Sequence, residues 1–247
     1  MIRFFVGPDD ISGGTIRLRA EDAEHIKALR LRPAEQFIVC DGAGNDYICR
    51  LGAAGPGAAG PGGSVAEITE IRASSGEPTV LCSAYIAYAK GDRLDYAVQK
   101  SVELGAYELV LFPSERCVSV PRETLRKTGR LRKIALETAK QCGRGRVPGV
   151  TALDSFATAI ERASRASLPL FLYECEDRLH LKQALERSSG AETISIVSGP
   201  EGGFEPSEAE RAKSAGMIAV SLGPRLLRCE TAPVAALAAV MYHTGNL

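Results

Sequence analysis

The sequence predicts an α/β protein in which a small β-rich barrel precedes a larger domain built on a parallel sheet. Three observations support this prediction. The first seventy residues hold short β segments separated by turn residues, apolar runs alternate with helical patterns after Pro78, and a Ser/Gly-containing break over 73–78 divides the two regions. A chain of 247 residues also exceeds what one small core usually organises. We therefore expect a barrel over 1–73 and an α/β domain over 74–247.

The first region favours a barrel because its β segments are short and only one helix interrupts them. Between two of these segments, residues 52–63 consist only of Gly, Ala and Pro, and they hold too few apolar side chains to offset the entropy lost on ordering. We interpret this stretch as a flexible hairpin loop. The expected strands are 2–6, 15–18, 36–40, 47–51 and 65–71, and the expected helix is 20–30.

Apolar runs in the second region are typical of strands buried on both faces of a parallel sheet, and the helical patterns between them are long enough for crossovers. Periodicity alone predicts an open, doubly wound sheet. Ligands bind such sheets beyond the carboxyl ends of the strands, so the loops after the last three strands are the first candidates for a site. The expected strands are 80–87, 109–112, 168–173, 194–197 and 218–222, and the expected helices are 92–104, 129–141, 156–163, 179–187, 206–215 and 228–243.

Composition argues against a membrane or secreted protein. The longest apolar stretch, 232–242, is far shorter than the ~20 residues that cross a bilayer, and the first residues contain no cationic segment followed by an apolar one. The seven cysteines lack CxxC or zinc spacing, and their odd number does not suit a disulfide framework. We therefore expect a cytoplasmic protein with no metal site.

The net charge is zero, with 30 basic and 30 acidic residues, but the charges are unevenly distributed along the chain. From Arg116 to Arg146 there are ten basic residues and two acidic ones. This stretch indicates a surface for a polyanion such as a nucleic acid. The alternative is a helix face that is simply solvated.

Two loops contain residues suited to ligand binding. The loop SGPEGGF, residues 198–204, follows a strand, and its three glycines let the backbone approach a ligand closely. It matches neither a Walker A loop nor a dinucleotide fingerprint, and a tight strand-to-helix turn is the alternative. In the loop at 221–232, Arg225 and Arg228 suit a phosphate or a base edge, whereas an ion pair with Glu201 or Glu230 is the alternative.

The last expected helix is rich in Ala and carries Val234, Leu237 and Met241 on one face. Small side chains allow close contact between helices. This face therefore fits a subunit interface as well as it fits a core.

Six motifs together carry a family resemblance. They are Arg3-Phe4-Phe5, His25-Ile26 with Leu29-Arg30, KSVELG at 100–105, QCGR at 141–144, GPEGGF at 199–204 and SLGPRLLRCETA at 221–232. In this order they resemble the ribosomal RNA small subunit methyltransferase E family over essentially the whole chain. The Gly/Ala/Pro stretch at 52–63 departs from the family pattern.

The resemblance implies an enzyme that transfers a methyl group from S-adenosylmethionine to N3 of a specific uridine in 16S ribosomal RNA. It also implies the SPOUT class of fold, with a PUA-like barrel followed by a trefoil-knotted α/β domain that binds the cofactor at a homodimer interface. The implied partner is 16S rRNA within the small ribosomal subunit.

Residue roles follow from the resemblance at the matching positions. Three knot loops would enclose the cofactor, and the basic stretch together with the barrel would hold the RNA; His25 alone fits an ordinary helix histidine as well. The expected cofactor-binding residues are Leu172, Tyr173, Glu174, Gly199, Pro200, Glu201, Gly202, Gly203, Leu222, Gly223, Leu226, Leu227 and Arg228. The expected RNA-binding residues are Arg3, His25, Arg30, Arg116, Arg122, Arg126, Arg130, Gln141, Arg144, Arg146 and Arg225.

Methyl transfer to N3 requires that the enzyme align N3 of the uridine with the methyl carbon of the cofactor and that N3 lose its proton. We expect Arg228 to stabilise negative charge on the uracil oxygens. Glu201 or Glu230 would accept the proton, although a carboxylate with an ordinary pKa is a weak base for this step. The sequence leaves open the base, the nucleotide position and whether free rRNA or an assembled subunit is the substrate. It also leaves two other functions open, a ribose 2′-hydroxyl methyltransferase and a non-catalytic RNA-binding protein.

Overall fold

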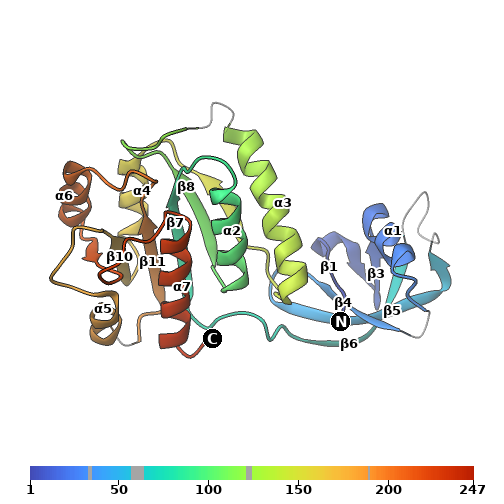
Figure 1. The fold of residues 1–247 in the computed structure, drawn as a ribbon. Coiled ribbons are helices and arrows are strands. Elements are labelled where there is room, and N and C mark those ends of the chain that lie inside the picture. The colour runs from blue at the N-terminus through green and yellow to red at the C-terminus, as the bar shows by residue number, and fades with distance from the viewer. Residues whose placement is uncertain (33–34, 57–63, 121–123, 189) are drawn as a thin grey trace. The chain divides into compact units, whose positions relative to one another are not determined.

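The computed structural model describes residues 1–32, 35–56, 64–120, 124–188 and 190–247. The chain forms two compact units (Figure 1). The first comprises Met1–Glu77 and Ala139–Val147, and the second comprises Pro78–Thr138 and Pro148–Leu247. Residues 139–147 therefore pack with the N-terminal unit, although they follow 61 residues of the second unit in the chain.

The N-terminal unit contains a six-stranded sheet in the order β1-β4-β5-β6-β3-β2. The β1–β4 pair is parallel and the other pairs are antiparallel. Apolar side chains from the strands and α1, among them Phe4, Ile16, Ile26 and Phe37, form one core. The elements are β1 (Arg3–Phe5), a 3-10 turn (Pro8–Asp10), β2 (Ile11–Ser12), β3 (Thr15–Leu18), α1 (Ala20–Ala28), β4 (Gln36–Cys40), β5 (Asn45–Pro56) and β6 (Ser64–Ala73).

The loop expected over 52–63 is only partly a loop. Strand β5 continues to Pro56, which pairs with Ser64 of β6, so the first part of the stretch belongs to the hairpin ladder. Residues 57–63 lie outside the described residues. The prediction for residues 52–56 was wrong because composition does not reveal that a neighbouring strand supplies hydrogen bonds to this backbone.

The second unit is built on a six-stranded, wholly parallel sheet in the order β12-β10-β11-β7-β8-β9. Every residue of β10 is buried, as expected for a strand covered on both faces. The strand β9 was missed, since four residues containing Gly and Thr give no apolar run. The strands are β7 (Leu81–Ala87), β8 (Glu108–Phe112), β9 (Gly149–Ala152), β10 (Leu168–Leu172), β11 (Thr193–Ser198) and β12 (Ile218–Val220).

Six helices connect these strands and follow the last one. Helix α3 begins at Thr124, before Gly129, the expected start. Thr128 on one side of this glycine and Leu131 and Ala135 on the other are buried on one face, which offsets the cost of ~1 kcal/mol for a helical Gly. The helices are α2 (Arg93–Glu103), α3 (Thr124–Cys142), α4 (Phe156–Ala163), α5 (Leu181–Arg187), α6 (Pro206–Ser214) and α7 (Thr231–His243). None of the helices in the described ranges combines the length and the apolar character needed to span a membrane.

The C-terminal segment does not continue outward from β12, as it would in an open doubly wound sheet. After β12, Ser221 donates its N–H to the carbonyl of Leu179 and accepts from the N–H of Leu181, both at 2.9 Å. Helix α7 then returns to pack against α2, α5, β7 and β11. The segment thus pairs with the connection that follows β10 and then covers the middle of the sheet.

Two of the three residues proposed for a subunit interface on α7 belong to the core. Leu237 and Met241 are both 0% exposed within the single chain. The outward face of α7 carries half-buried Ala235 and Ala238 and, at its end, Tyr242. Periodicity identified an apolar face but could not distinguish an intramolecular contact from an intermolecular one.

Candidate functional site

Several connections leave the same edge of the parallel sheet of the second unit. Strands β7 and β11 are neighbours, with Ser198 paired with Ile86 at their carboxyl ends. The last residue of β10 and the connections that follow β10, β11 and β12 hold all the residues expected to bind the cofactor. Parallel pairing therefore brings together loops that are far apart in the sequence.

The glycine-rich turn after β11 packs closely against protein atoms. A Cβ on Gly202 would lie 2.9 Å from Cβ of Arg116, and a Cβ on Gly199 would lie 3.1 Å from the Phe204 ring. Gly203 has φ +69°, and a Cβ there would clash with the carboxylate of Glu174. The tight turn that the sequence offered as an alternative is thus part of the explanation for these glycines.

A buried carboxylate anchors this turn to the connection after β8. Glu208, in the first turn of α6, accepts hydrogen bonds from the Ser114 hydroxyl at 3.0 Å and from the N–H groups of Glu115 and Glu205 at 3.1 and 3.0 Å. Arg116 then reaches Glu205 at 2.7 Å and the carbonyl of Gly202 at 3.1 Å. Sequence analysis missed Ser114 and Glu208, although Glu208 lies three residues after the helix N-cap, where capping-box acids occur.

A second carboxylate, Glu201, links the same turn to the start of α2. Its Oε1 accepts hydrogen bonds from the N–H of Lys90 and from Nη1 of Arg93, both at 2.8 Å. Burial acts to raise the pKa of the Glu201 carboxyl, but backbone N–H groups and the Arg93 guanidinium outweigh it and hold that pKa below its ordinary value. The lowered pKa makes the Glu201 carboxylate a weaker base than an ordinary glutamate, and therefore poorly suited to accept the N3 proton.

Arg93 also faces Glu230, one of the candidate bases. Its Nε lies 3.8 Å from Oε2 of Glu230, which in turn accepts from the Cys229 thiol at 3.2 Å. The sequence pattern did not single out Arg93. Arg93 begins the helix that follows β7, the first strand of the parallel sheet along the chain. Because ligands bind at the carboxyl edge of such a sheet, the connection after β7 could have been included among the candidate loops.

Arg228 and Arg225 are exposed, and within the described part of the chain neither side chain forms a hydrogen bond or an ion pair. The predicted alternative, an ion pair of Arg228 with Glu201 or Glu230, is not formed among the described residues, and Arg93 lies against both carboxylates instead. Leu226, between the two arginines, is 84% exposed.

The remaining residues expected around the cofactor differ in burial. Leu172 and Pro200 are buried, Tyr173, Gly199, Leu222, Gly223 and Leu227 are partly buried, and Glu174 and Gly202 are exposed. Within the described ranges, no group of three His, Cys, Asp or Glu side chains is placed to hold a metal ion.

Much of the basic stretch is neutralised by carboxylates from elsewhere in the chain. Arg130 and Lys127 of α3 both pair with Asp95 of α2, and Lys140 lies 3.7 Å from Asp22. Arg126 and Gln141 are exposed, Arg146 is half-buried, and Arg122 lies outside the described residues. The local count of charges in the sequence therefore overstated the free positive charge of this surface.

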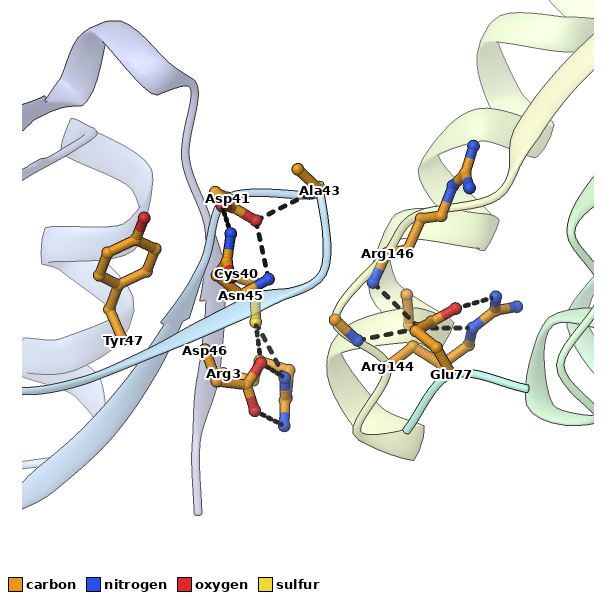
Figure 2. A network of polar contacts seen from close by, with 12 residues as sticks. Arg3, Cys40, Asp41, Ala43, Asn45, Asp46, Tyr47, Glu77, Arg144 and Arg146 are labelled. Carbon is orange, nitrogen blue, oxygen red and sulfur yellow. Dashed lines mark hydrogen bonds and ion pairs between the residues drawn. The ribbon is translucent and has the colours of Figure 1, made fainter. Parts of the chain in front are cut away.

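Arg3 is buried in the N-terminal unit and does not reach the surface that the sequence suggested for it (Figure 2). Its two terminal nitrogens donate to the two oxygens of Asp46 at 2.6 and 3.0 Å, and Nη1 also lies 2.9 Å from Sγ of Cys40. His25 and Arg30 are exposed, and the His25 ring makes an edge contact with Phe4.

Arg144 is likewise held inside this unit, by Glu77 (Figure 2). Arg144 donates to the Glu77 carboxylate through Nε at 3.2 Å and Nη2 at 2.6 Å. The backbone N–H groups of Gly145 and Arg146 donate to the same carboxylate at 3.1 Å. Four donors converge on Glu77, so this carboxylate fixes the segment that follows α3.

The comparison with known proteins decides the family. The chain matches models of an RNA methyltransferase domain over residues 77–241 and an RNA methyltransferase PUA domain over residues 18–59. Ribosomal RNA small subunit methyltransferase E of Bacillus subtilis is 30% identical over 245 residues, which cover 94% of this chain and 92% of that protein. The chain belongs to the ribosomal RNA small subunit methyltransferase E family.

Other members of the ribosomal RNA small subunit methyltransferase E family agree in sequence and in structure. The Synechocystis protein is 31% identical, with 96% of this chain and 76% of that protein covered. A crystal structure of the Neisseria gonorrhoeae enzyme, bound to S-adenosyl methionine, is 32% identical and superimposes with a TM-score of 0.81 over 98% of this chain and 97% of that one. Membership confirms the predicted fold class, a PUA-like domain before a SPOUT domain, and the predicted enzyme class, an S-adenosylmethionine-dependent RNA methyltransferase.

We expect Glu77→Ala to destabilise the N-terminal unit by about 3–5 kcal/mol, because it leaves the buried Arg144 guanidinium without its carboxylate. Denaturant unfolding, combined with hydrogen exchange of residues 139–147, measures this loss. The matched control is Glu67→Ala, which breaks the exposed pair with Arg50 and should cost less than about 1 kcal/mol. Equal losses in the two variants would contradict a structural role for Glu77.

Proposed function

We propose that this enzyme transfers the methyl group of S-adenosylmethionine to N3 of a specific uridine in 16S rRNA of the small ribosomal subunit, in the cytoplasm. The observation that carries the proposal is full-length similarity to ribosomal RNA small subunit methyltransferase E proteins, whose motif loops converge at one edge of the parallel sheet in this chain. In the proposal, residues 1–73 bind RNA and residues 74–247 perform the methyl transfer.

The loops at the carboxyl edge fit S-adenosylmethionine chemically. Leu172 and Pro200 provide buried apolar surface, and Leu222 and Leu227 are partly buried. Glu201 Oε2 is buried and accepts no hydrogen bond from the described residues, which leaves an acceptor for an ammonium or hydroxyl donor. When bound, the cofactor supplies an activated methyl group. The residues that would hold it are those of 172–174, 199–203 and 222–228.

The chain's own contribution is alignment and charge stabilisation. A paired uridine hides N3, so the target must be unpaired or flipped out before transfer. The unpaired guanidinium of Arg228 can donate to the uracil oxygens, where negative charge develops as N3 loses its proton. Because Arg93 and the Lys90 N–H help to lower the pKa of Glu201, this carboxylate is a weak base; in the proposal it holds its loop in place, and the proton passes to Glu230 or to water.

The RNA contact is proposed for cations that remain at the surface. Arg30, Arg225 and Arg228 are exposed, as are Arg126 and Arg130. The Arg130 side chain is 57% exposed even though it pairs with Asp95, so its open side can contact a phosphate. Arg3 and Arg144 act within the proposal by shaping the N-terminal unit.

The homodimer in the proposal uses the outward face of α7. Tyr242 is 77% exposed, and Ala235 and Ala238 lie beside it at helical spacing. Tyr96 of α2, the helix that packs against α7, is 48% exposed. A two-fold axis at this face would bury the same apolar patch twice.

We expect nucleoside mass spectrometry of 16S rRNA, methylated by the purified protein with S-adenosylmethionine, to detect 3-methyluridine at one position. Small subunits and free rRNA should be tested in parallel to identify the substrate. A 2′-O-methylated nucleoside would instead support the ribose alternative. RNA binding without calorimetric heat for S-adenosylmethionine would support a non-catalytic protein.

We expect Arg228→Ala to lower the single-turnover rate by ~100- to 1000-fold with cofactor and RNA saturating, since one donor to a developing oxyanion is lost. Arg228→Lys should recover little, because an ammonium lacks the planar fork. The control is Arg165→Ala, which breaks an exposed pair with Glu161. A normal single-turnover rate with weakened calorimetric affinity for the cofactor would exclude the catalytic role.

We expect Tyr242→Arg to convert a dimer into monomers in sedimentation experiments, because it places a charge within the apolar face of α7. The control is Ile71→Arg, since Ile71 is also exposed but lies on β6 of the other unit. A dimer that persists in Tyr242→Arg would exclude this face as the interface.

A further inference from the structure

Arg93, the first residue of α2, joins two loops that the sequence separates by about thirty residues. Its Nη1 donates to Oε1 of Glu201 at 2.8 Å, in the glycine-rich turn. Its Nε lies 3.8 Å from Oε2 of Glu230, the N-cap residue of α7. One guanidinium therefore lies between the carboxylates of two loops expected to enclose the cofactor.

The fold explains why these three residues meet. Strands β7 and β11 are paired up to Ile86 and Ser198, so the connections that follow them leave the sheet side by side. Helix α7 packs against α2, which brings the N-cap of α7 to the first turn of α2. The N–H of Lys90, in the connection after β7, reinforces the arrangement by donating to Glu201 Oε1 at 2.8 Å.

This charge arrangement bears directly on Arg228. Glu201 and Glu230 are the carboxylates that the sequence offered as ion-pair partners of Arg228. In the structure Arg93 lies against both, and Arg228 forms no side-chain ion pair with the described residues. A guanidinium without a carboxylate partner is available to an anionic substrate.

We propose that Arg93 is a positioning residue, which holds the Glu201 turn against the start of α7 and keeps Arg228 available for the RNA substrate. The proposal rests on the methyl-transfer function proposed above. Arg93 acts through the carboxylates and touches neither reacting atom. Its planar fork can address two carboxylates at once, which the single ammonium of a lysine does less well.

Cofactor affinity should depend on the same arrangement. The two donors on Oε1 fix the Glu201 carboxylate, while Oε2 is buried without a donor among the described residues. If this oxygen accepts from the cofactor, loss of Arg93 moves the acceptor and weakens binding. This gives a readout that does not need RNA or turnover.

The experiment compares Arg93→Ala and Arg93→Lys with the control Lys100→Ala. Lys100 lies on the same helix and pairs with Glu103 in the next turn of that helix. Lys100→Ala therefore removes an ion pair from α2 without affecting a contact between loops. Melting temperature, calorimetric affinity for S-adenosylmethionine and single-turnover methylation at saturation are measured for each. We expect Arg93→Ala to lower the single-turnover rate by about 10- to 100-fold and to weaken cofactor affinity. Arg93→Lys should fold and recover only part of both losses.

A double-mutant cycle with Glu230→Gln tests the mechanism. In the Arg93→Ala background the Arg93–Glu230 contact is already lost, so Glu230→Gln should weaken affinity for S-adenosylmethionine less there than in the wild-type background. Independent effects of the two changes on rate and affinity would overturn the proposal. A fall in melting temperature with normal rate and affinity in the folded Arg93 variants would also overturn it, because the bridge would then be only structural.

The outcomes separate this proposal from the proposed function. If wild-type protein binds S-adenosylmethionine but methylates no rRNA, the proposed function fails, and the affinity cycle still tests whether Arg93 positions Glu201. If wild-type protein methylates rRNA and Arg93→Ala does so at the wild-type rate and affinity, only the role of Arg93 is excluded.

Discussion

The candidate site depends on one constraint, which is that six parallel strands end at the same edge and the polar loops leaving that edge must satisfy one another's charges. Two glutamates meet this requirement. Glu208 gathers three donors from the connection after β8 and the start of α6, and Glu201 binds the loop after β7. The glycine-rich turn lies between them, so its shape is set before any ligand binds. This preorganisation suits a reaction whose main requirement is alignment.

The same balance of charge explains why the basic stretch is less cationic than its sequence suggests. Asp95, Asp22 and Glu77 come from segments distant in the chain, yet they neutralise cations of α3 and of the segment after it. These ion pairs differ in what they do for the structure. The Arg144–Glu77 pair is buried and fixes backbone, whereas Arg130 remains more than half exposed, as its proposed contact with a phosphate requires. The surface proposed for RNA is therefore narrower than the run of arginines and lysines.

The burial of each side chain also limits the roles that can be proposed for it. Leu237 and Met241 fill the core beneath α7, so the dimer that we propose uses the opposite face of this helix, where Tyr242 is exposed. Arg3 forms a two-point pair with Asp46 inside the N-terminal unit. Arg228 is exposed and unpaired within the described chain, as its proposed role requires. Each assignment rests on which side chains tertiary packing leaves accessible.

Local periodicity and residue order were enough to predict the order of the two regions, five of the six parallel strands, the helices between them and, through the motifs, the family. Sequence analysis missed β9, whose four residues carry no apolar run, and it assigned 52–56 to a loop because their ladder partner is remote. It also missed Arg93, Glu77 and Glu208. Only the tertiary structure decided these roles and the return of α7 over the sheet. Ion pairs and burial depend on residues far apart in the chain, and neither local charge counts nor periodicity contains that information.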